Sequence, residues 1–209
     1  MSPTDSDLAY RRLKERIVTV EMRPGSVIRE AELMSELKLG RTPIREALKR
    51  LEVEDLVISA PHRGTHVAEI SITDLTQMYE VRVELENLSA RQAARRVQPH
   101  QLEEMRTLAA EYQQRDRDDL DLLFKLDRRF HMALAGAANN RFLSREIDRY
   151  YNLSLRIWYL ALRFVRAQDV DVQAHLEMID CVAAGDDAGA EAAMREHLRH
   201  FHSTIKHYL

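Results

Sequence analysis

The chain has 209 residues, a net charge of −3 and a single cysteine. This length allows one large or two small domains, and the lone thiol of Cys181 excludes an internal disulfide and suits a reducing compartment, so we expect a cytoplasmic protein. No apolar run reaches the length of a membrane span. The weak net charge excludes a broad electrostatic grip on polyanions, so any such contact has to come from local clusters.

Two short helices are predicted before residue 40. The first carries an apolar stripe at helical spacing and ends before a turn signal at residues 23–25. Its stripe consists of Leu8, Leu13, Ile17 and Val20. Residues 30–37 form the second helix, while the pair at 27–28 is too short to classify. A tight turn at residues 38–40 leads into a third helix, which gives a helix-turn-helix arrangement.

The third helix begins near residue 41 and carries the most informative pattern of the chain. Its buried stripe follows the i, i+3, i+4, i+7 spacing. The stripe consists of Ile44, Ala47, Leu48 and Leu51. The Thr42 hydroxyl is a candidate cap, and Pro43 fits the first helical position, where no N–H is needed.

Basic side chains lie off this stripe, near the exposed start of the third helix. Arg41 and Arg45 belong to its first turns, and Lys49 follows one turn later. Residues 38–50 hold five basic side chains against one acidic side chain, a local charge of +4. A helix that buries one side and presents arginines from its first turn suits the major groove of double-stranded DNA. The alternative is an amphipathic surface helix whose charges are solvated.

Two β-type runs follow, at residues 56–60 and 65–68, around the turn residues 61–64. They predict a hairpin with a basic tip. We expect this hairpin to be a wing whose Arg63 enters the neighbouring minor groove. Residues 1–70 are therefore predicted to be a winged helix-turn-helix domain, which is helical apart from the small hairpin.

Residues 8–70 resemble the winged helix of the GntR family of bacterial transcription regulators. The similar segments are 23–25, 33–37, 41–48, 51–52 and 63–65, and the middle one, Arg-Thr-Pro-Ile-Arg-Glu-Ala-Leu, is specific. The resemblance implies DNA contacts by Arg41, Thr42, Arg45 and the wing tip at Arg63 and Gly64, and the local charge adds Lys49. Where the family usually has a glycine and a small hydroxyl residue before the first arginine, this chain has Lys38 and Gly40.

From residue 71 onward the pattern predicts helices and no strand. Six helices are expected, which implies a mostly α chain that ends in an antiparallel helical bundle. The first begins near Thr73, and the others cover about 99–115, 118–138, 141–166, 169–184 and 187–207. Residues 71–209 are therefore predicted to be an all-helical second domain.

Four residues of this bundle are candidates for one metal site. Asp127 and His131 are four residues apart and project from the same helical face. His175 precedes the helix-stopping Gly185 by ten residues and His197 follows it by twelve, so two antiparallel helices bring them to similar heights. Three imidazoles and one carboxylate suit zinc, nickel or another divalent transition metal.

A chance origin of this pattern has to be weighed, because the chain has nine histidines. His131 would also serve as a hydrogen-bonded core residue. The other histidines of the last helix, His200, His202 and His207, would simply be solvated. The residues alone leave these alternatives open.

Residues 73–207 resemble the FCD ligand-binding domain, which typically accompanies this kind of winged helix. The similar segments are 124–134, 174–175 and 196–198. The resemblance implies that Asp127, His131, His175 and His197 hold the ion, with zinc as the first choice and nickel or manganese as alternatives. Ala174, where many members have glutamate, is a departure beside a ligand position.

The two resemblances imply a transcription regulator rather than an enzyme, one that binds an inverted-repeat DNA operator as a homodimer. Repression is the expected sign. A four-ligand metal site has room for a carboxylate, so the expected effector is a small organic or sugar acid. Arg82 is a candidate partner of that carboxylate, or pairs within its helix with Glu86. Two alternatives stay open: a regulator that senses the ion itself, and a metal-dependent hydrolase, against which the lack of a His-Glu-x-x-His motif counts.

Overall fold

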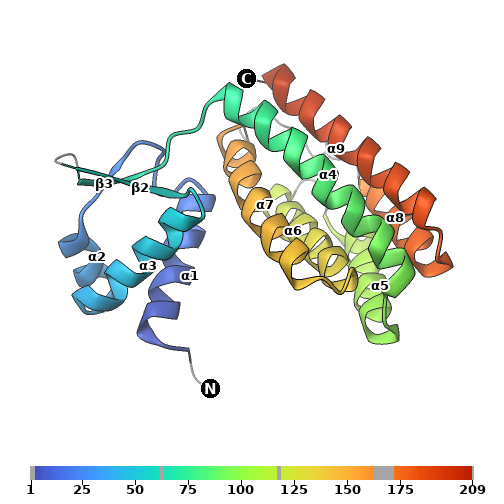
Figure 1. The fold of residues 1–209 in the computed structure, drawn as a ribbon, viewed down its shortest axis with the longest axis horizontal. Helices are drawn as coiled ribbons and strands as arrows, with labels where there is room; N and C mark the ends of the chain where they lie inside the picture. Colours follow the sequence, from blue (N-terminus) through green and yellow to red (C-terminus); the bar gives the residue numbers. More distant parts are fainter. Residues whose placement is uncertain (1–2, 62–63, 117–118, 162–171, 209) are drawn as a thin grey trace. The chain divides into compact units, whose positions relative to one another are not determined.

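The computed structural model describes residues 3–61, 64–116, 119–161 and 172–208. These residues form two compact units (Figure 1). One unit contains the residues up to Ser71 together with Asn152–Leu160, and the other contains Ile72–Tyr151 together with the described part of 161–209. The predicted domain boundary after residue 70 remains a prediction.

Three helices open the first unit: α1 (Asp5–Val18), α2 (Glu30–Leu37) and α3 (Arg41–Val53). Thr4 begins α1 with a capping box, in which its hydroxyl accepts from the Asp7 N–H and the Asp7 carboxylate accepts from the Thr4 N–H. α1 and α2 both pack on α3. Leu13, Ile17 and Ile44 are fully buried between these helices. The apolar stripes thus hold the helix-turn-helix together and leave the other face of α3 to solvent.

A small antiparallel sheet completes the winged helix. Its strands are β1 (Val27–Ile28), β2 (Val57–Ala60) and β3 (Gly64–Val67), in the order β1-β3-β2. β2 and β3 form the predicted wing hairpin, with Ala60 opposite Gly64. β1 pairs with the other edge of β3, with Val27 opposite His66. The predicted winged helix is confirmed, and the pair of residues that the sequence left unclassified is its third strand.

The first helix is shorter than predicted. It ends at Val18, and Val20, which was expected on its apolar stripe, has a left-handed backbone with φ of 61°. The chain has already turned back at this point, because the Met22 N–H donates to the Arg16 carbonyl at 2.9 Å. The assignment of Val20 to the helical stripe was therefore wrong.

The predicted start of α3 was also wrong in detail. Gly40 is the N-cap residue, and no side chain caps the helix. Thr42 and Pro43 consequently occupy the second and third helical positions. The missing N–H of Pro43 is still harmless there, because the first four N–H groups of a helix have no intrahelical partner.

A short connector joins the wing to the helical half of the chain. Ala68 still belongs to the winged helix, because its N–H donates to the Leu56 carbonyl at 3.0 Å. α4 (Ile72–Arg96) begins four residues later. Only residues 69–71 lie between them, and none of these three is in a helix or strand.

Among the described residues, the second half of the chain is entirely helical, as predicted. After α4 come α5 (Pro99–Gln114), α6 (Leu120–Ala137), α7 (Arg141–Ala161), α8 (Val172–Ala184) and α9 (Asp187–Tyr208). α4 runs along α9 and also packs on α6 and α8, and α5 packs on α6 and α8. The ends predicted near 166 and 169 lie outside the described residues.

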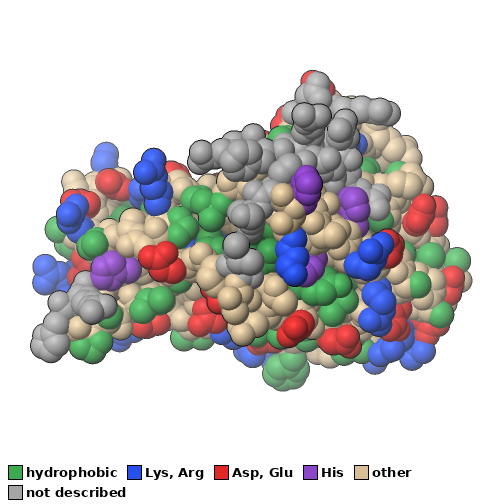
Figure 2. Space-filling view, turned by 90° about the horizontal axis from the view of Figure 1, so that it is seen from above, with side chains coloured by type: hydrophobic (Ala, Val, Ile, Leu, Met, Phe, Trp, Pro, Cys, Tyr) green, Lys and Arg blue, Asp and Glu red, His purple; other side chains and the backbone are tan. Residues whose placement is uncertain are grey.

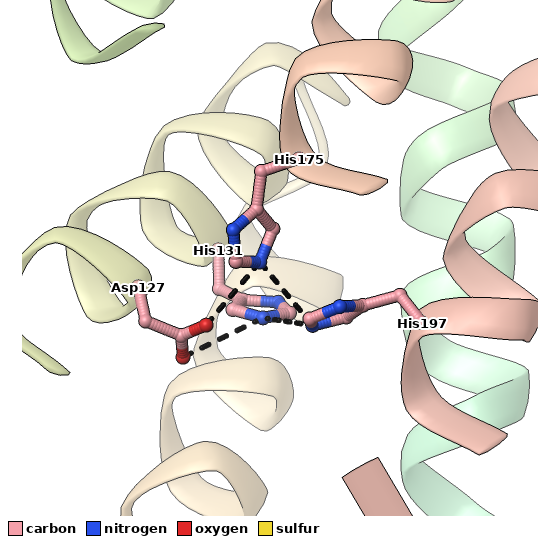
Figure 3. Close-up of side chains that lie close together, drawn as sticks. All are labelled: Asp127, His131, His175 and His197. Carbon is pink, nitrogen blue, oxygen red and sulfur yellow. Dashed lines mark hydrogen bonds and ion pairs between the residues drawn. The ribbon is translucent and has the colours of Figure 1, made fainter. Parts of the chain in front are cut away.

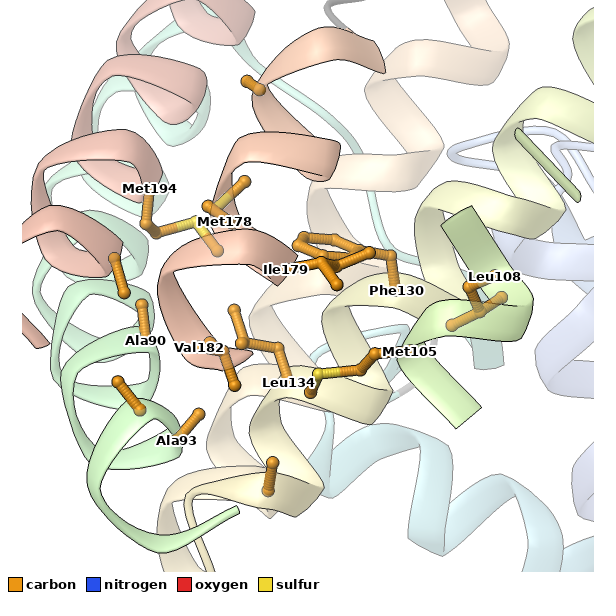
Figure 4. Packing of buried hydrophobic residues seen from close by; sticks show 14 of the residues in the cluster. Ala90, Ala93, Met105, Leu108, Phe130, Leu134, Met178, Ile179, Val182 and Met194 are labelled. Carbon is orange, nitrogen blue, oxygen red and sulfur yellow. The ribbon is translucent and has the colours of Figure 1, made fainter. Parts of the chain in front are cut away.

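Figure 4 shows the apolar core on which these helices pack. Its side chains come from α4, α5, α6, α8 and α9. They include Ala90, Ala93, Met105, Leu108, Phe130, Leu134, Met178, Ile179, Val182 and Met194, all of them buried. Alanines on α4 allow neighbouring helices to approach closely. This core fixes the register of α6, α8 and α9, from which the candidate metal ligands project.

Candidate metal centre and recognition helix

The predicted DNA-reading residues lie on the solvent side of α3. Arg41, Thr42, Arg45 and Lys49 are all exposed. The Arg45 guanidinium makes one surface ion pair, with Glu30 on α2 at 2.9 Å. Gly64 is exposed at the start of β3 with φ of 79°, a left-handed conformation that favours glycine. Arg63 lies outside the described residues.

Lys38 has an unusual backbone for its residue type. It ends α2 in the left-handed region, with φ of 55° and ψ of 40°. Helices commonly end with glycine in this conformation, because a Cβ atom crowds the backbone there. The position where the resemblance expects glycine is therefore the position that needs one, and Lys38 accepts the strain.

Positive charge does not gather into one broad patch. On the face drawn in Figure 2, basic and acidic side chains are interspersed. This agrees with the net charge of −3. Contact with DNA would depend on oriented side chains at short range, such as those of α3.

Three helices bring the four predicted metal ligands together, as Figure 3 shows. α6 supplies Asp127 and His131, α8 supplies His175 and α9 supplies His197. The His197 Nε2 atom lies 3.3 Å from the Nε2 atoms of both other histidines. The Asp127 carboxylate lies 3.2 Å from His175 Nε2 and 3.8 Å from His131 Nε2. The candidate ligand atoms of all four residues lie within 4.8 Å of one another.

This spacing fits a small divalent ion. An ion about 2.0–2.1 Å from each ligand atom keeps neighbouring ligand atoms roughly 3.0–3.4 Å apart. The three imidazole nitrogens cannot all donate to one another, whereas one cation accepts all three lone pairs. The three histidines are buried, and the Asp127 side chain is 17% exposed. The donor set of three nitrogens and one carboxylate suits zinc and its first-row neighbours.

Two further side chains contact the candidate ligands. Glu86 on α4 lies with one carboxylate oxygen against His131 Nδ1. The Tyr151 hydroxyl on α7 donates to Asp127 Oδ2 at 2.6 Å. Both contacts come from outside the four-residue set, and each leaves an atom of the ligand pointing toward the cluster.

Arg82 lies one helical turn before Glu86 and pairs with it. Its Nε donates to Glu86 Oε1 at 2.5 Å, and both side chains are buried. The guanidinium also lies 5.1 Å from the ring centre of Tyr151 and 5.2 Å from that of Phe201. Of the two partners considered for Arg82 from the sequence, the structure contains the intrahelical one. Its effector contact stays a prediction.

Electrostatics keeps these groups in the form that a metal requires. Burial works to raise the pKa of Glu86, but the charge of Arg82 and then His131 hold it at about 2. Burial likewise opposes ionisation of Asp127, yet His131 and the hydrogen bond with His175 hold its pKa well below 3.8. Burial and the two other imidazoles lower the pKa of His197 well below 6.5. The carboxylates are thus ionised and His197 neutral at neutral pH.

The remaining histidines of α9 lie apart from the four-residue group. His202 stacks on Tyr79, with ring centroids 4.2 Å apart. His200 and His207 are exposed. The sequence analysis therefore separated the clustered histidine of α9 from its neighbours correctly, but it missed the roles of Glu86 and Tyr151 beside the cluster. The Arg82–Glu86 spacing was the available signal for the first of these.

Comparisons with known proteins define the class. The bacterial regulatory proteins of the gntR family match residues 6–67, and the FCD domain matches residues 77–200. A winged helix-turn-helix joined to this helical domain defines a DNA-binding transcription regulator. The chain belongs to the GntR family, with an FCD domain as its second part.

Relatives of known class cover nearly the whole chain. The HTH-type transcriptional repressor RspR of Escherichia coli K12 is 28% identical, over 94% of this chain and 87% of the relative. A regulator in an unstable DNA locus of Streptomyces ambofaciens is 31% identical, over 91% of this chain and 80% of the relative. The solved structure of E. coli McbR/YncC has the same fold, with a TM-score of 0.87 over 99% of both chains at 20% identity.

Membership of this family answers two further questions. The family consists of transcription regulators rather than enzymes, so the hydrolase alternative is set aside on this ground. In the part of the chain that the structure describes, no helix is long and apolar enough to cross a membrane.

Proposed function

We propose that the protein represses transcription as a homodimer on an inverted-repeat operator, in the cytoplasm, and that a small carboxylate effector at a metal ion changes its DNA affinity. The observation that carries this proposal is the buried group of Asp127, His131, His175 and His197 in the FCD domain. Repression is supported by RspR, a relative whose name describes a repressor.

The charge of the centre favours an anionic effector. Arg82 and Glu86 cancel one another, so a divalent ion beside the single carboxylate of Asp127 leaves an excess of one positive charge. A bound ion supplies a Lewis acid to which a carboxylate oxygen can bind. Zinc is the first choice, and nickel or manganese would use the same donors. Small organic and sugar acids are the class of effector that this charge favours.

Operator recognition is assigned to α3 and the wing. Arg45 and Arg41 have the reach and donor geometry for guanine edges in the major groove, and Thr42 and Lys49 suit phosphate contacts. The wing tip at Arg63 and Gly64 is assigned to the minor groove. A twofold dimer presents two identical heads, which is why the operator should be an inverted repeat.

The test measures how an acid changes operator binding. Wild type, Asp127→Ala and the control Asp121→Ala are loaded with zinc and titrated onto the selected operator with acetate, lactate or gluconate as probes. Asp121 is a matched control, since its carboxylate is on the same helix but lies at the surface, paired with Lys125. We expect an acid to shift operator affinity about 5- to 150-fold in wild type and control, and not in Asp127→Ala. A folded Asp127→Ala that responds fully would overturn the role of the ion.

A metal sensor is the second candidate. The observation in its favour is that three separate helices contribute ligands, so an ion alone ties α6, α8 and α9 together. Titration with zinc in the absence of any acid separates the two. A large change in operator affinity with zinc alone, and no further change with the acids, would replace the proposed effector by the ion itself.

A further inference from the structure

Glu86 is the buried carboxylate closest to the metal centre that is not itself in the ligand group. It lies on α4, a helix that contributes none of the four candidate ligands, and it is 1% exposed. One of its oxygens accepts from Arg82, and the other faces His131 Nδ1. The carboxylate therefore bridges a cation and a candidate ligand.

Stability alone is a poor explanation for this arrangement. Removing a carboxylate and a guanidinium from water costs several kcal/mol per ion, and well-packed apolar residues in place of a buried pair are often equally stable or more stable. Both side chains are nonetheless buried, at 4% and 2% exposure. A role beyond packing would account for them.

The geometry at His131 supplies that role. A neutral imidazole carries one proton, and the nitrogen that donates a hydrogen bond leaves the other nitrogen with its lone pair free. With Glu86 at Nδ1, the proton is held on that side. The Nε2 lone pair then faces the cluster, 3.3 Å from His197 Nε2 and 3.8 Å from Asp127 Oδ2.

We propose that Glu86 is a positioning residue of the metal centre, which fixes the tautomer and ring orientation of His131 while Arg82 holds the Glu86 carboxylate in place. The inference rests on the proposed metal centre. Carboxylate partners of ligand histidines typically improve metal affinity 10- to 100-fold. Through Glu86, α4 takes part in metal binding without providing a ligand.

The test uses a double variant, Arg82→Leu with Glu86→Leu, which removes both buried charges together and so leaves neither one unpaired. The control is Arg91→Gln with Glu191→Gln, which removes an ion pair of 2.9 Å between α4 and α9 that involves no ligand. Zinc affinity of the metal-free full chain is measured by competition with a chromogenic chelator, with no effector present. Thermal unfolding of the metal-free forms reports whether each variant folds.

We expect the Arg82/Glu86 variant to fold and to bind zinc 10- to 100-fold more weakly, with the control unchanged. The single variant Glu86→Gln keeps an acceptor for His131 and should lose roughly tenfold at most. In zinc-loaded wild type, nitrogen NMR should find the His131 proton on Nδ1. Wild-type zinc affinity in a folded double variant, or equal losses in Glu86→Gln and the double variant, would overturn the positioning role. Failure of wild type itself to bind zinc, nickel or manganese would instead overturn the metal centre, and this role with it.

Discussion

Arg45 on α3 and Arg82 on α4 both pair with a glutamate, but in opposite surroundings. The Arg45 side chain is 58% exposed, whereas that of Arg82 is 4% exposed. An exposed ion pair contributes little to folding, so Arg45 can exchange Glu30 for DNA at small cost. A buried pair cannot be separated without leaving an uncompensated charge. The winged helix thus keeps its functional charges available to a partner, and the helical unit keeps its own compensated inside the protein.

Loss of a candidate metal ligand should have the largest effect on the buried side of this comparison. His175→Ala and His197→Ala should each abolish zinc binding and with it the stabilisation by the ion, which is about 4 kcal/mol at a thousandfold excess over Kd. Metal analysis and thermal unfolding with and without zinc measure both quantities. His202→Ala is the matched control, because His202 stacks on Tyr79 on the same helix as His197. Zinc loss in the control and not in His197→Ala would show that the wrong histidine of α9 was chosen.

The buried pair should also make stability depend on pH. Because Arg82 holds the folded-state pKa of Glu86 at about 2, below its usual 4.5, the stabilisation is complete above pH 4.5 and is lost as pH falls toward 2. We expect the metal-free wild type to lose about 2 kcal/mol more between pH 5.5 and pH 3 than the Arg82→Leu/Glu86→Leu variant. Urea unfolding at each pH gives the free energies. Parallel pH curves would mean that the pair contributes nothing through ionisation.

On the exposed side, Arg45→Ala should impair function and leave folding intact. A bidentate arginine–guanine contact is worth about 1–3 kcal/mol of discrimination. Affinity for the selected operator should fall by that amount, while affinity for random DNA and the free energy of unfolding change little. Arg145→Ala, an arginine whose side chain is 75% exposed on α7, is the control. Equal losses on operator and random DNA would assign Arg45 to a phosphate, and no loss would remove α3 as the recognition helix.

The smallest effect concerns Lys38 at the end of α2. Because its backbone is left-handed, Lys38→Gly should raise the free energy of unfolding by about 1 kcal/mol. Lys38→Ala keeps the Cβ atom and should give no such gain, which makes it the control. If Lys38 also contacts a phosphate, both variants should weaken operator and random DNA alike. A gain in stability from alanine equal to that from glycine would exclude backbone strain as the cause.

Local patterns predicted most of the fold. The spacing of Ile44, Ala47, Leu48 and Leu51 identified α3, and turn residues identified the wing. What failed was local detail. Val27–Ile28 is a strand only because β3 lies beside it, and two residues carry no period of their own. The cap of α3 shifted from Thr42 to Gly40, a difference that residue preferences at helix ends do not resolve.

The candidate site divides in the same way. Asp127 and His131 share one helix, and Gly185 relates His175 to His197, so helix geometry alone predicted that each pair would lie close together. The contact of Glu86 with His131 spans 45 residues, and that of Tyr151 with Asp127 spans 24. These contacts depend on the register of α4 and α7 against α6. That register is set by core packing, which one sequence without its structure does not reveal.

The connector of residues 69–71 limits how the protein can search for its operator. Three extended residues let the Cα atoms of Ala68 and Ile72 separate by roughly 14 Å at most. Each DNA-reading head is therefore on a short leash from the start of α4. One inserted base pair turns the second half-site by about 34° around the duplex as well as moving it along, and five turn it to the opposite face. A dimer tethered this way should tolerate sequence changes between its half-sites far better than changes in their spacing.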